Sequence, residues 1–266
     1  MRRVVVIGRG KVGSALARAA RRARVRVASV SARALPAAFG PADLVVVASR
    51  DADIGRLASL LAARLAPDVP VVHCSGALGP DALAPLRASN HPVGSMHPLA
   101  SFASSRAAPP LAGAAMVITG DAAARRAAAR FGRVIGMRPV VLASLDPARY
   151  HAAAALLSNG SAALAAAASE LLGAAGVPAE HHARLLGPLL GSVASNVGSL
   201  GTGAALTGPI RRGDAATVAR PLEVLSDTPL RSLYKEIARA QLPLAARLGD
   251  ADPAALGAID ALLEAP

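Results

Sequence analysis

The chain has 266 residues, 53% of them hydrophobic and 17% charged, which excludes a disordered protein and leaves room for one large or two ordinary folded domains. Its formal net charge of +12 would suit binding to a polyanion. The only lysines are Lys11 and Lys235, however, and the arginines are scattered along the chain. We therefore attribute the charge to an Ala- and Arg-rich composition and expect no nucleic-acid partner. Two Tyr, three Phe and no Trp also leave little from which to build an aromatic platform for single-stranded nucleic acid.

The N-terminal half alternates short β-branched runs with amphipathic stretches. We expect strands over residues 3–8, 25–30, 43–48, 69–73, 92–95, 116–119 and 139–142, and helices over 12–22, 53–63 and 121–135. This alternation predicts a parallel sheet with crossover helices. Because the first residues lead directly into a strand, we expect neither a signal peptide nor a membrane anchor there.

One cysteine, Cys74, lies in this half. A single thiol excludes an internal disulfide and a zinc site made of several cysteines, and it favours a reducing compartment, the cytoplasm. His181 and His182 are neighbours on an expected helix, so their side chains diverge and we expect no metal site.

The C-terminal half is helical in pattern. Helices are expected over 146–175, 179–201, 214–226, 229–249 and 252–264, the first opening with Asp146 as a cap and Pro147 at its first position. We therefore expect two domains, 1–144 and 145–266. The alanine-rich run 152–168 carries Ser158 and Asn159, polar groups that are costly in lipid, so we expect a buried helix and no membrane contact.

A glycine-rich turn joins the first expected strand to the first expected helix. It consists of Gly8, Arg9, Gly10, Lys11, Val12 and Gly13. In such a turn the first glycine permits a tight bend, the second lets the backbone approach a pyrophosphate, and the third allows close packing of helix on strand. The N–H groups that open the helix face the phosphates. This context favours dinucleotide binding over an ordinary turn.

The end of the second expected strand indicates which dinucleotide binds. NAD-binding chains carry Asp or Glu there, about 20 residues after the turn, to bind the ribose 2′-hydroxyl. This chain has Ser31 and Arg33 instead, and a guanidinium beside a hydroxyl suits a 2′-phosphate. Arg9 and Arg50 would add to the positive field. We expect NADP(H), the alternative being that Arg33 is one more solvated arginine.

Polar residues follow the other expected strands. They are Ser49 and Arg50 after one strand, His73 to Gly76 after the next, and His97 and Pro98 after a third. Ligands of open parallel sheets bind beyond the carboxyl ends of the strands. We assign Ser49, Arg50 and Ser75 to the cofactor and His97 to the cleft, although a plain turn is equally consistent with Ser75.

One face of the long helix that begins near Asp146 is polar. A step of about 100° per residue brings His151, Ala155, Ser158 and Asn159 to one side. Imidazole titrates near neutral pH, so His151 is our candidate proton donor to a carbonyl, Asn159 would orient the substrate or nicotinamide, and Ser158 would contact the substrate. The alternative is that His151 is a core histidine with its hydrogen bonds satisfied and that Asn159 packs between helices.

The loop from Leu206 to Asp214 leads into a helix that Asp214 would cap. Thr207 and Arg212 in this loop are candidates for binding a substrate carboxylate. A purely structural turn is an equally good interpretation.

These features together resemble a known bacterial family. The glycine turn, His73 to Gly76, Gly94 to Phe102, Tyr150 to Asn159 and Leu206 to Asp214 carry the resemblance, which covers essentially the whole chain. Members pair a doubly wound Rossmann domain with an all-helical C-terminal domain of unknown function. The family resembles a branch of the 6-phosphogluconate dehydrogenase superfamily, alongside ketopantoate reductase, pyrroline-5-carboxylate reductase and deazaflavin-dependent NADP reductases.

The resemblance implies an α/β fold with an NADP(H)-binding domain over 1–144 and a helical substrate and dimerisation domain of the 6-phosphogluconate dehydrogenase type over 145–266. It also implies a homodimer and reduction of a small 2-oxo acid, with ketopantoate as the named substrate. One residue departs from the pattern: relatives carry a lysine four residues before a helix asparagine, and counting back from Asn159 gives Ala155. His151 or His97 would then replace the lysine. The alternatives are a non-catalytic NADP(H)-binding sensor or assembly protein, and a reductase of imines or deazaflavin.

Overall fold

The computed structural model describes residues 1–104, 109–226 and 228–265. The chain divides into two compact units, Met1–Gly160 and Ser161–Pro266, and the division falls inside the long helix α5 (Pro147–Ala174). The expected domain limit near residue 144 lies in the loop before this helix.

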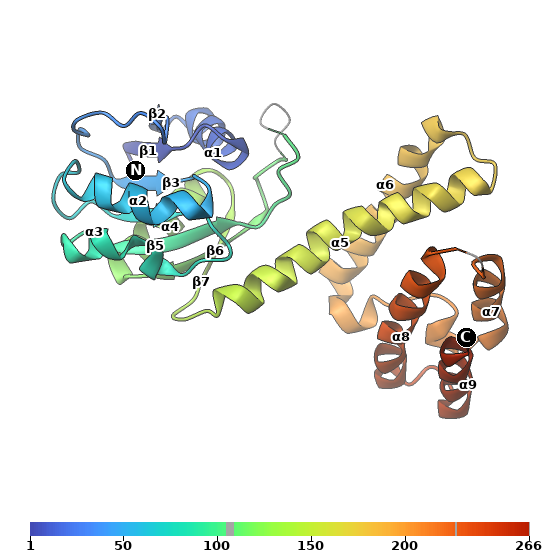
Figure 1. Cartoon of the computed structure of the whole chain (residues 1–266). Helices are drawn as coiled ribbons and strands as arrows, with labels where there is room; N and C mark the ends of the chain where they lie inside the picture. Colours follow the sequence, from blue (N-terminus) through green and yellow to red (C-terminus); the bar gives the residue numbers. More distant parts are fainter. Residues whose placement is uncertain (105–108, 227, 266) are drawn as a thin grey trace. The chain divides into compact units, whose positions relative to one another are not determined.

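The first unit is built on a seven-stranded sheet (Figure 1). In chain order the strands are β1 (Arg3–Ile7), β2 (Arg26–Val30), β3 (Leu44–Val47), β4 (Val71–His73), β5 (Val93–Pro98), β6 (Ala115–Gly120) and β7 (Arg138–Val141). Their order in the sheet is β2-β1-β3-β4-β5-β6-β7. The strand order reverses between β1 and β3, and this switch point is where doubly wound sheets bind their ligands, beyond the carboxyl ends of the strands.

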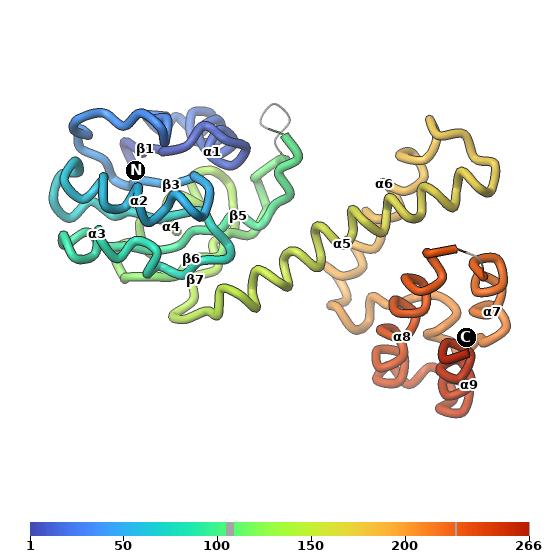
Figure 2. The backbone as a smooth tube through the Cα atoms, viewed as in Figure 1, coloured from blue at the N-terminus to red at the C-terminus, as the bar shows by residue number. Residues whose placement is uncertain are grey.

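One pair of strands departs from the expected parallel sheet. The first five strands are parallel, but β6 runs antiparallel to β5, with His97 opposite Val117. A parallel pair needs a crossover, usually a helix, to return the chain to the starting edge. In the described part of the link between β5 and β6, residues 99–104 and 109–114, there is neither helix nor strand (Figure 2).

Helices cover both faces of the sheet. On one face, α1 (Lys11–Arg22) and α4 (Ala122–Val134) pack against Val4 and Val6; on the other, α2 (Asp51–Ala62), η1 (Pro80–Leu83) and α3 (Ala84–Ala88) pack against Val5 and Ile7. Alternate residues of β1 therefore enter different cores, as the period of a strand requires. All four of these side chains are fully buried, which explains the continuous apolar run in the sequence.

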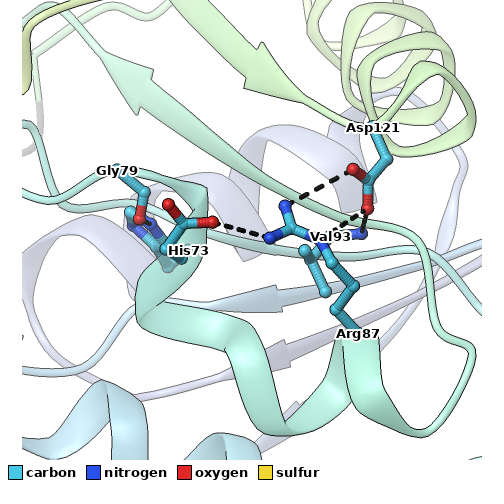
Figure 3. Close-up of polar contacts among 6 residues, drawn as sticks. His73, Gly79, Arg87, Val93 and Asp121 are labelled. Carbon is cyan, nitrogen blue, oxygen red and sulfur yellow. Dashed lines mark hydrogen bonds and ion pairs between the residues drawn. The ribbon is translucent and has the colours of Figure 1, made fainter.

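A polar cluster ties α3 to the strands β5 and β6 (Figure 3). Arg87 donates to Asp81 at 2.6 Å and to Asp121 at 3.4 Å. Asp121 precedes α4, but its carboxylate makes no capping bond to that helix. It accepts instead from the backbone N–H of Val93 at 2.8 Å. This bond closes the end of the β5–β6 ladder and so fixes the strand that carries His97.

The second unit is helical. It contains the rest of α5, then α6 (Ala179–Ala204), η2 (Ile210–Arg212), α7 (Ala215–Val224), α8 (Leu230–Leu248) and α9 (Pro253–Glu264). Its core is small and lies between the last helices, with Val218, Ile259 and Leu263 fully buried. Asp214 caps α7 as expected, because its carboxylate accepts from the N–H of Thr217 at 3.0 Å.

The expectation that residues 152–168 form a buried helix is wrong for this chain. None of the residues of α5 is buried, and Leu156 and Leu157 are 79% and 73% exposed. Ala165, Ala167 and Ala168 are half-buried, and the hydroxyl of Ser169 lies 2.7 Å from Nδ1 of His182 on α6, so the helix is covered only in part. Among these residues α5 alone is long and apolar enough to cross a membrane, by length and composition only.

Candidate functional site

The glycine turn is shaped by backbone contacts that only glycine permits. Gly8 has φ +114°, and a Cβ there would lie 2.2 Å from the carbonyl oxygen of Ala48. A Cβ on Gly13 would lie 2.1 Å from the oxygen of Gly8. The end of β1 is therefore in contact with the end of β3 and with the first turn of α1, at the switch point of the sheet.

No contact within the described part of the chain requires glycine at the middle position, Gly10. Gly10 precedes α1, and a Cβ on it would meet nothing within 4 Å. No side chain caps the helix, and its first turn holds no acidic residue. Open space, free N–H groups and the positive end of the helix dipole suit a phosphate. The turn thus fits the pyrophosphate of a dinucleotide, and Val12 is half-buried against the core.

The other residues assigned to the cofactor lie along the same edge of the sheet. Arg9 donates to the carbonyl oxygen of Ser29 in β2 at 3.1 Å, and the hydroxyl of Ser31 accepts from the N–H of Arg33 at 3.2 Å. The side chains of Arg33 and Arg50 are exposed. Ser31 and Arg33 thus follow the end of β2, beside the glycine turn.

The loop after β4 is organised by His73, which is fully buried. Its Nδ1 accepts from the N–H of Ser75 at 3.2 Å, so its Nε2 carries the proton and donates to the oxygen of Gly79 at 2.9 Å. Burial lowers the pKa of His73, which keeps the ring neutral. The hydroxyl of Ser75 accepts from the N–H of Ala77, so it shapes this turn whether or not it also meets a cofactor.

His97 and Tyr150 form the polar centre of the first unit. His97 lies near the end of β5 and Tyr150 in the first turns of α5, and the ring Nδ1 lies 2.7 Å from the phenol oxygen. The rings meet edge to face, with centroids 5.5 Å apart. Gly76 makes room for this arrangement, because a Cβ on it would lie 2.9 Å from the imidazole.

The environment of His97 keeps its imidazole neutral. Burial lowers its pKa, and so do the nearby His151 and His73, while Asp51 raises it. Burial also raises the pKa of Tyr150, so the phenol stays protonated near neutral pH.

A hollow of about 570 Å³ opens beside this pair. His151, Ser158 and Asn159 line it from α5, together with Ala155, and His97 and Leu99 line it from β5 and the link that follows. Residues from several sides of the helix line the hollow, and those inferred from the sequence are among them. Ser158 donates to the backbone oxygen of Ala154 at 2.9 Å, whereas His151 is exposed.

Sequence reasoning assigned no role to Tyr150. The signal available was that it is one of two tyrosines in the chain and begins an alanine-rich helix. Its partner is 53 residues away in sequence, which periodicity does not reveal.

Thr207 and Arg212 belong to the second unit, so their expected role at the carboxylate stays a prediction. Among the residues that the structure describes, no three His, Cys, Asp or Glu side chains gather to hold a metal ion.

Comparison with known proteins supports the fold. Residues 114–241 match a family model described as a domain of unknown function, DUF2520. No curated protein matches the chain. Among solved structures the chain is similar to BF3122 from Bacteroides fragilis, provisionally named an NADP oxidoreductase (21% identity, TM-score 0.70, 90% of this chain and 97% of that one).

Two further structures share the architecture. Protein TM1727 from Thermotoga maritima is 23% identical over 92% of this chain and 99% of its own, with a TM-score of 0.70. A reductive aminase from Aspergillus terreus, in complex with NADPH, is 16% identical over 99% of this chain and 93% of its own, with a TM-score of 0.56. The chain therefore has the α/β fold of Rossmann-type NAD(P)-binding oxidoreductases, with a helical C-terminal domain.

Proposed function

We propose that the protein is an NADP(H)-dependent oxidoreductase that reduces the carbonyl group of a small 2-oxo acid, with ketopantoate as the first substrate to test. The observation that carries this proposal is that the glycine turn and the hollow around His97 lie along one edge of one sheet. The ends of β1 and β5 are three strand spacings apart, roughly 14 Å, a distance that an extended dinucleotide can bridge.

The residues of the hollow supply the remaining chemistry. NADPH would supply a hydride when bound. Reduction of a carbonyl also needs a proton at the oxygen, and His151 and His97 are the imidazoles that line the hollow. Asn159 would hold the substrate or the nicotinamide by its amide, and Ser158 would contact the substrate. Ala155 stands where the reductases that the chain resembles carry a lysine, so another residue that lines the hollow would supply the proton.

The preference for NADP(H) over NAD(H) rests on Ser31 and Arg33. A guanidinium binds a phosphate through charge-assisted hydrogen bonds, and no carboxylate follows β2 to bind a free ribose hydroxyl. Arg33→Ala should weaken NADPH binding about tenfold or more and leave NADH binding within about twofold. Titration calorimetry with both cofactors measures this, and an equal loss for both would contradict the preference.

Thr207 and Arg212 are our candidates for binding a substrate carboxylate. Among the residues that the structure describes, those that line the hollow include no Lys or Arg. Purified protein should oxidise NADPH when ketopantoate or another 2-oxo acid is added, and Arg212→Ala should raise KM far more for the acid than for a neutral ketone. Oxidation of NADPH with imines or deazaflavin, and not with 2-oxo acids, would favour the alternative of an imine or deazaflavin reductase. No oxidation with any of these compounds would remove the enzymatic proposal.

Ala155 favours one alternative, a non-catalytic NADP(H)-binding sensor or assembly protein. Such a protein would bind NADPH tightly without turnover, and its function would survive the substitutions His151→Ala and His97→Ala. For either function we propose a cytoplasmic homodimer held by the helical domain.

A further inference from the structure

The geometry points to Tyr150 as the residue that donates the proton to the substrate oxygen, with His97 as the residue that restores that proton. This inference rests on the proposed reduction. Because Ala155 cannot donate a proton, this inference assigns the protonation of the substrate oxygen to two residues of the first unit.

The contacts of Tyr150 set it apart from the other polar groups of the hollow. Its hydroxyl is held 2.7 Å from Nδ1 of His97, and both side chains line the hollow. His151 is exposed, and within the described part of the chain its ring makes no hydrogen bond. A donor must be held in place to act, and Tyr150 meets this condition better than His151 does.

A second, smaller cavity is also lined by this pair. It measures about 10 Å³ and is lined by Tyr150 and His97 together with the hydroxyl-bearing residues Ser75, Ser95 and Thr119. This is roughly the space that one water molecule requires. The hydroxyls of Ser95 and Thr119 are buried and lie 2.7 Å apart, so the wall of the cavity can both donate and accept hydrogen bonds.

The pair therefore lies between a substrate-sized hollow and a small cavity lined in part by hydroxyl groups. As hydride reaches the carbonyl carbon, the O–H bond of Tyr150 breaks and an O–H bond to the substrate forms. The Nδ1–H proton of His97 moves to the phenol oxygen, and Nε2 takes a proton from water. The ring ends neutral with its proton on Nε2, and loss of that proton to water with gain of one proton at Nδ1 restores the starting tautomer. The overall reaction consumes one hydride from the reduced nicotinamide and one proton from water.

This sequence requires a particular tautomer of His97. For the phenol O–H to be free for the substrate, Nδ1 must carry the proton and donate it to Tyr150, leaving Nε2 as the acceptor. Burial lowers the pKa of His97, and so do His151 and His73, while Asp51 raises it. The ring is therefore neutral near neutral pH and carries one proton, on Nδ1 or on Nε2. His73, whose Nδ1 accepts from a backbone N–H, is held in the opposite tautomer.

The test reads both rings in one sample without cofactor or substrate. Nitrogen NMR of the whole chain, with resonances assigned by His97→Gln and His73→Gln, should show the proton of His97 on Nδ1 and that of His73 on Nε2. In Tyr150→Phe the His97 resonances should move toward a mixture of tautomers while those of His73 stay unchanged. A proton on Nε2 of His97 in the parent protein would overturn the proposal, whatever reaction the protein catalyses.

Kinetics supply the second measurement once a substrate turns over. Tyr150→Phe should lower kcat by about 100-fold or more with little change in KM or NADPH binding, the range expected for loss of an acid catalyst. His97→Gln should lower kcat as well, while Tyr234→Phe, the matched control in the second unit, should leave it unchanged. A full kcat in Tyr150→Phe combined with its loss in His151→Gln would assign the proton to His151. If no compound is reduced, the proposed function fails and with it the role of Tyr150 as a donor to substrate. The NMR measurement then still shows whether Nδ1 of His97 donates to the phenol oxygen.

Discussion

At the scale of single residues, three glycines in one turn meet three different requirements. Gly8 needs a left-handed backbone, Gly13 needs the absence of a side chain, and Gly10 needs neither in this structure. A requirement that no internal contact explains is the one most simply attributed to a ligand. We therefore propose that the fold requires Gly8 and Gly13 and that the dinucleotide requires Gly10, two roles that substitution can separate.

Alanine at Gly10 should mainly weaken NADPH binding, whereas alanine at Gly8 should mainly destabilise the fold. Gly10→Ala should fold with a loss of about 1 kcal/mol or less and lose at least about tenfold in NADPH affinity. Gly8→Ala should be destabilised by more than the roughly 1–3 kcal/mol of backbone strain alone, because its Cβ also meets Ala48. Urea unfolding and titration calorimetry measure the two effects. Unchanged NADPH binding in Gly10→Ala would contradict the proposed site of the pyrophosphate.

The lowered pKa of the buried His73 leads us to expect that the stability of the fold depends on pH. Its pKa is lowered in the folded chain, so the unfolded chain binds the proton more readily below about pH 6.5, the ordinary value. Protonation would also turn Nδ1 into a donor that faces the N–H of Ser75. The free energy of unfolding should fall as pH drops below about 6.5 and level off below the folded pKa. Urea titrations from about pH 8 to about pH 5 measure this, and His73→Gln should show a shallower decline.

At the scale of elements, Asp121 shows how one carboxylate positions a strand (Figure 3). It accepts from the N–H of Val93 and pairs with Arg87, which also pairs with the exposed Asp81. Asp121→Ala should cost about 1–3 kcal/mol of unfolding free energy, because it leaves a partly buried N–H without an acceptor. Asp81→Ala, the matched control, removes only an exposed ion pair and should cost less than about 0.5 kcal/mol. Equal losses in the two variants would show that the bond to Val93 contributes little.

The sequence predicted most elements because their hydrophobic periods and caps are local features. The runs of Val before Gly8 and the caps Asp146 and Asp214 are of this kind. The short helix α3, the antiparallel pairing of β5 with β6, and the contact between His97 and Tyr150 were not predicted. Each depends on how distant segments meet in the folded chain, and a helix of five residues has too few positions to show a period.

At the scale of the whole molecule, the two units differ in how far they bury their large apolar side chains. The sheet of the first unit has both faces covered, whereas α6 exposes a row of large side chains: Leu185, Leu189, Val193, Val197 and Leu200. Their spacing of three or four residues places them on one face of the helix. A continuous exposed apolar face of this kind indicates a protein interface. It supports the proposal of a homodimer held by the helical domain.

A charge in the middle of this face should therefore separate the protomers. Leu189 is 62% exposed, and burying such a side chain in an interface contributes about 1.5–3 kcal/mol, which a buried glutamate would reverse. Sedimentation should show a dimer for the parent chain and a monomer for Leu189→Glu. Ser195→Glu adds the same charge on another side of α6, about 120° away, and should stay dimeric. NADPH binding should persist in both variants, since the glycine turn belongs to the first unit. A parent chain that sediments as a monomer would contradict the dimer, and the exposed face of α6 would then require a different partner.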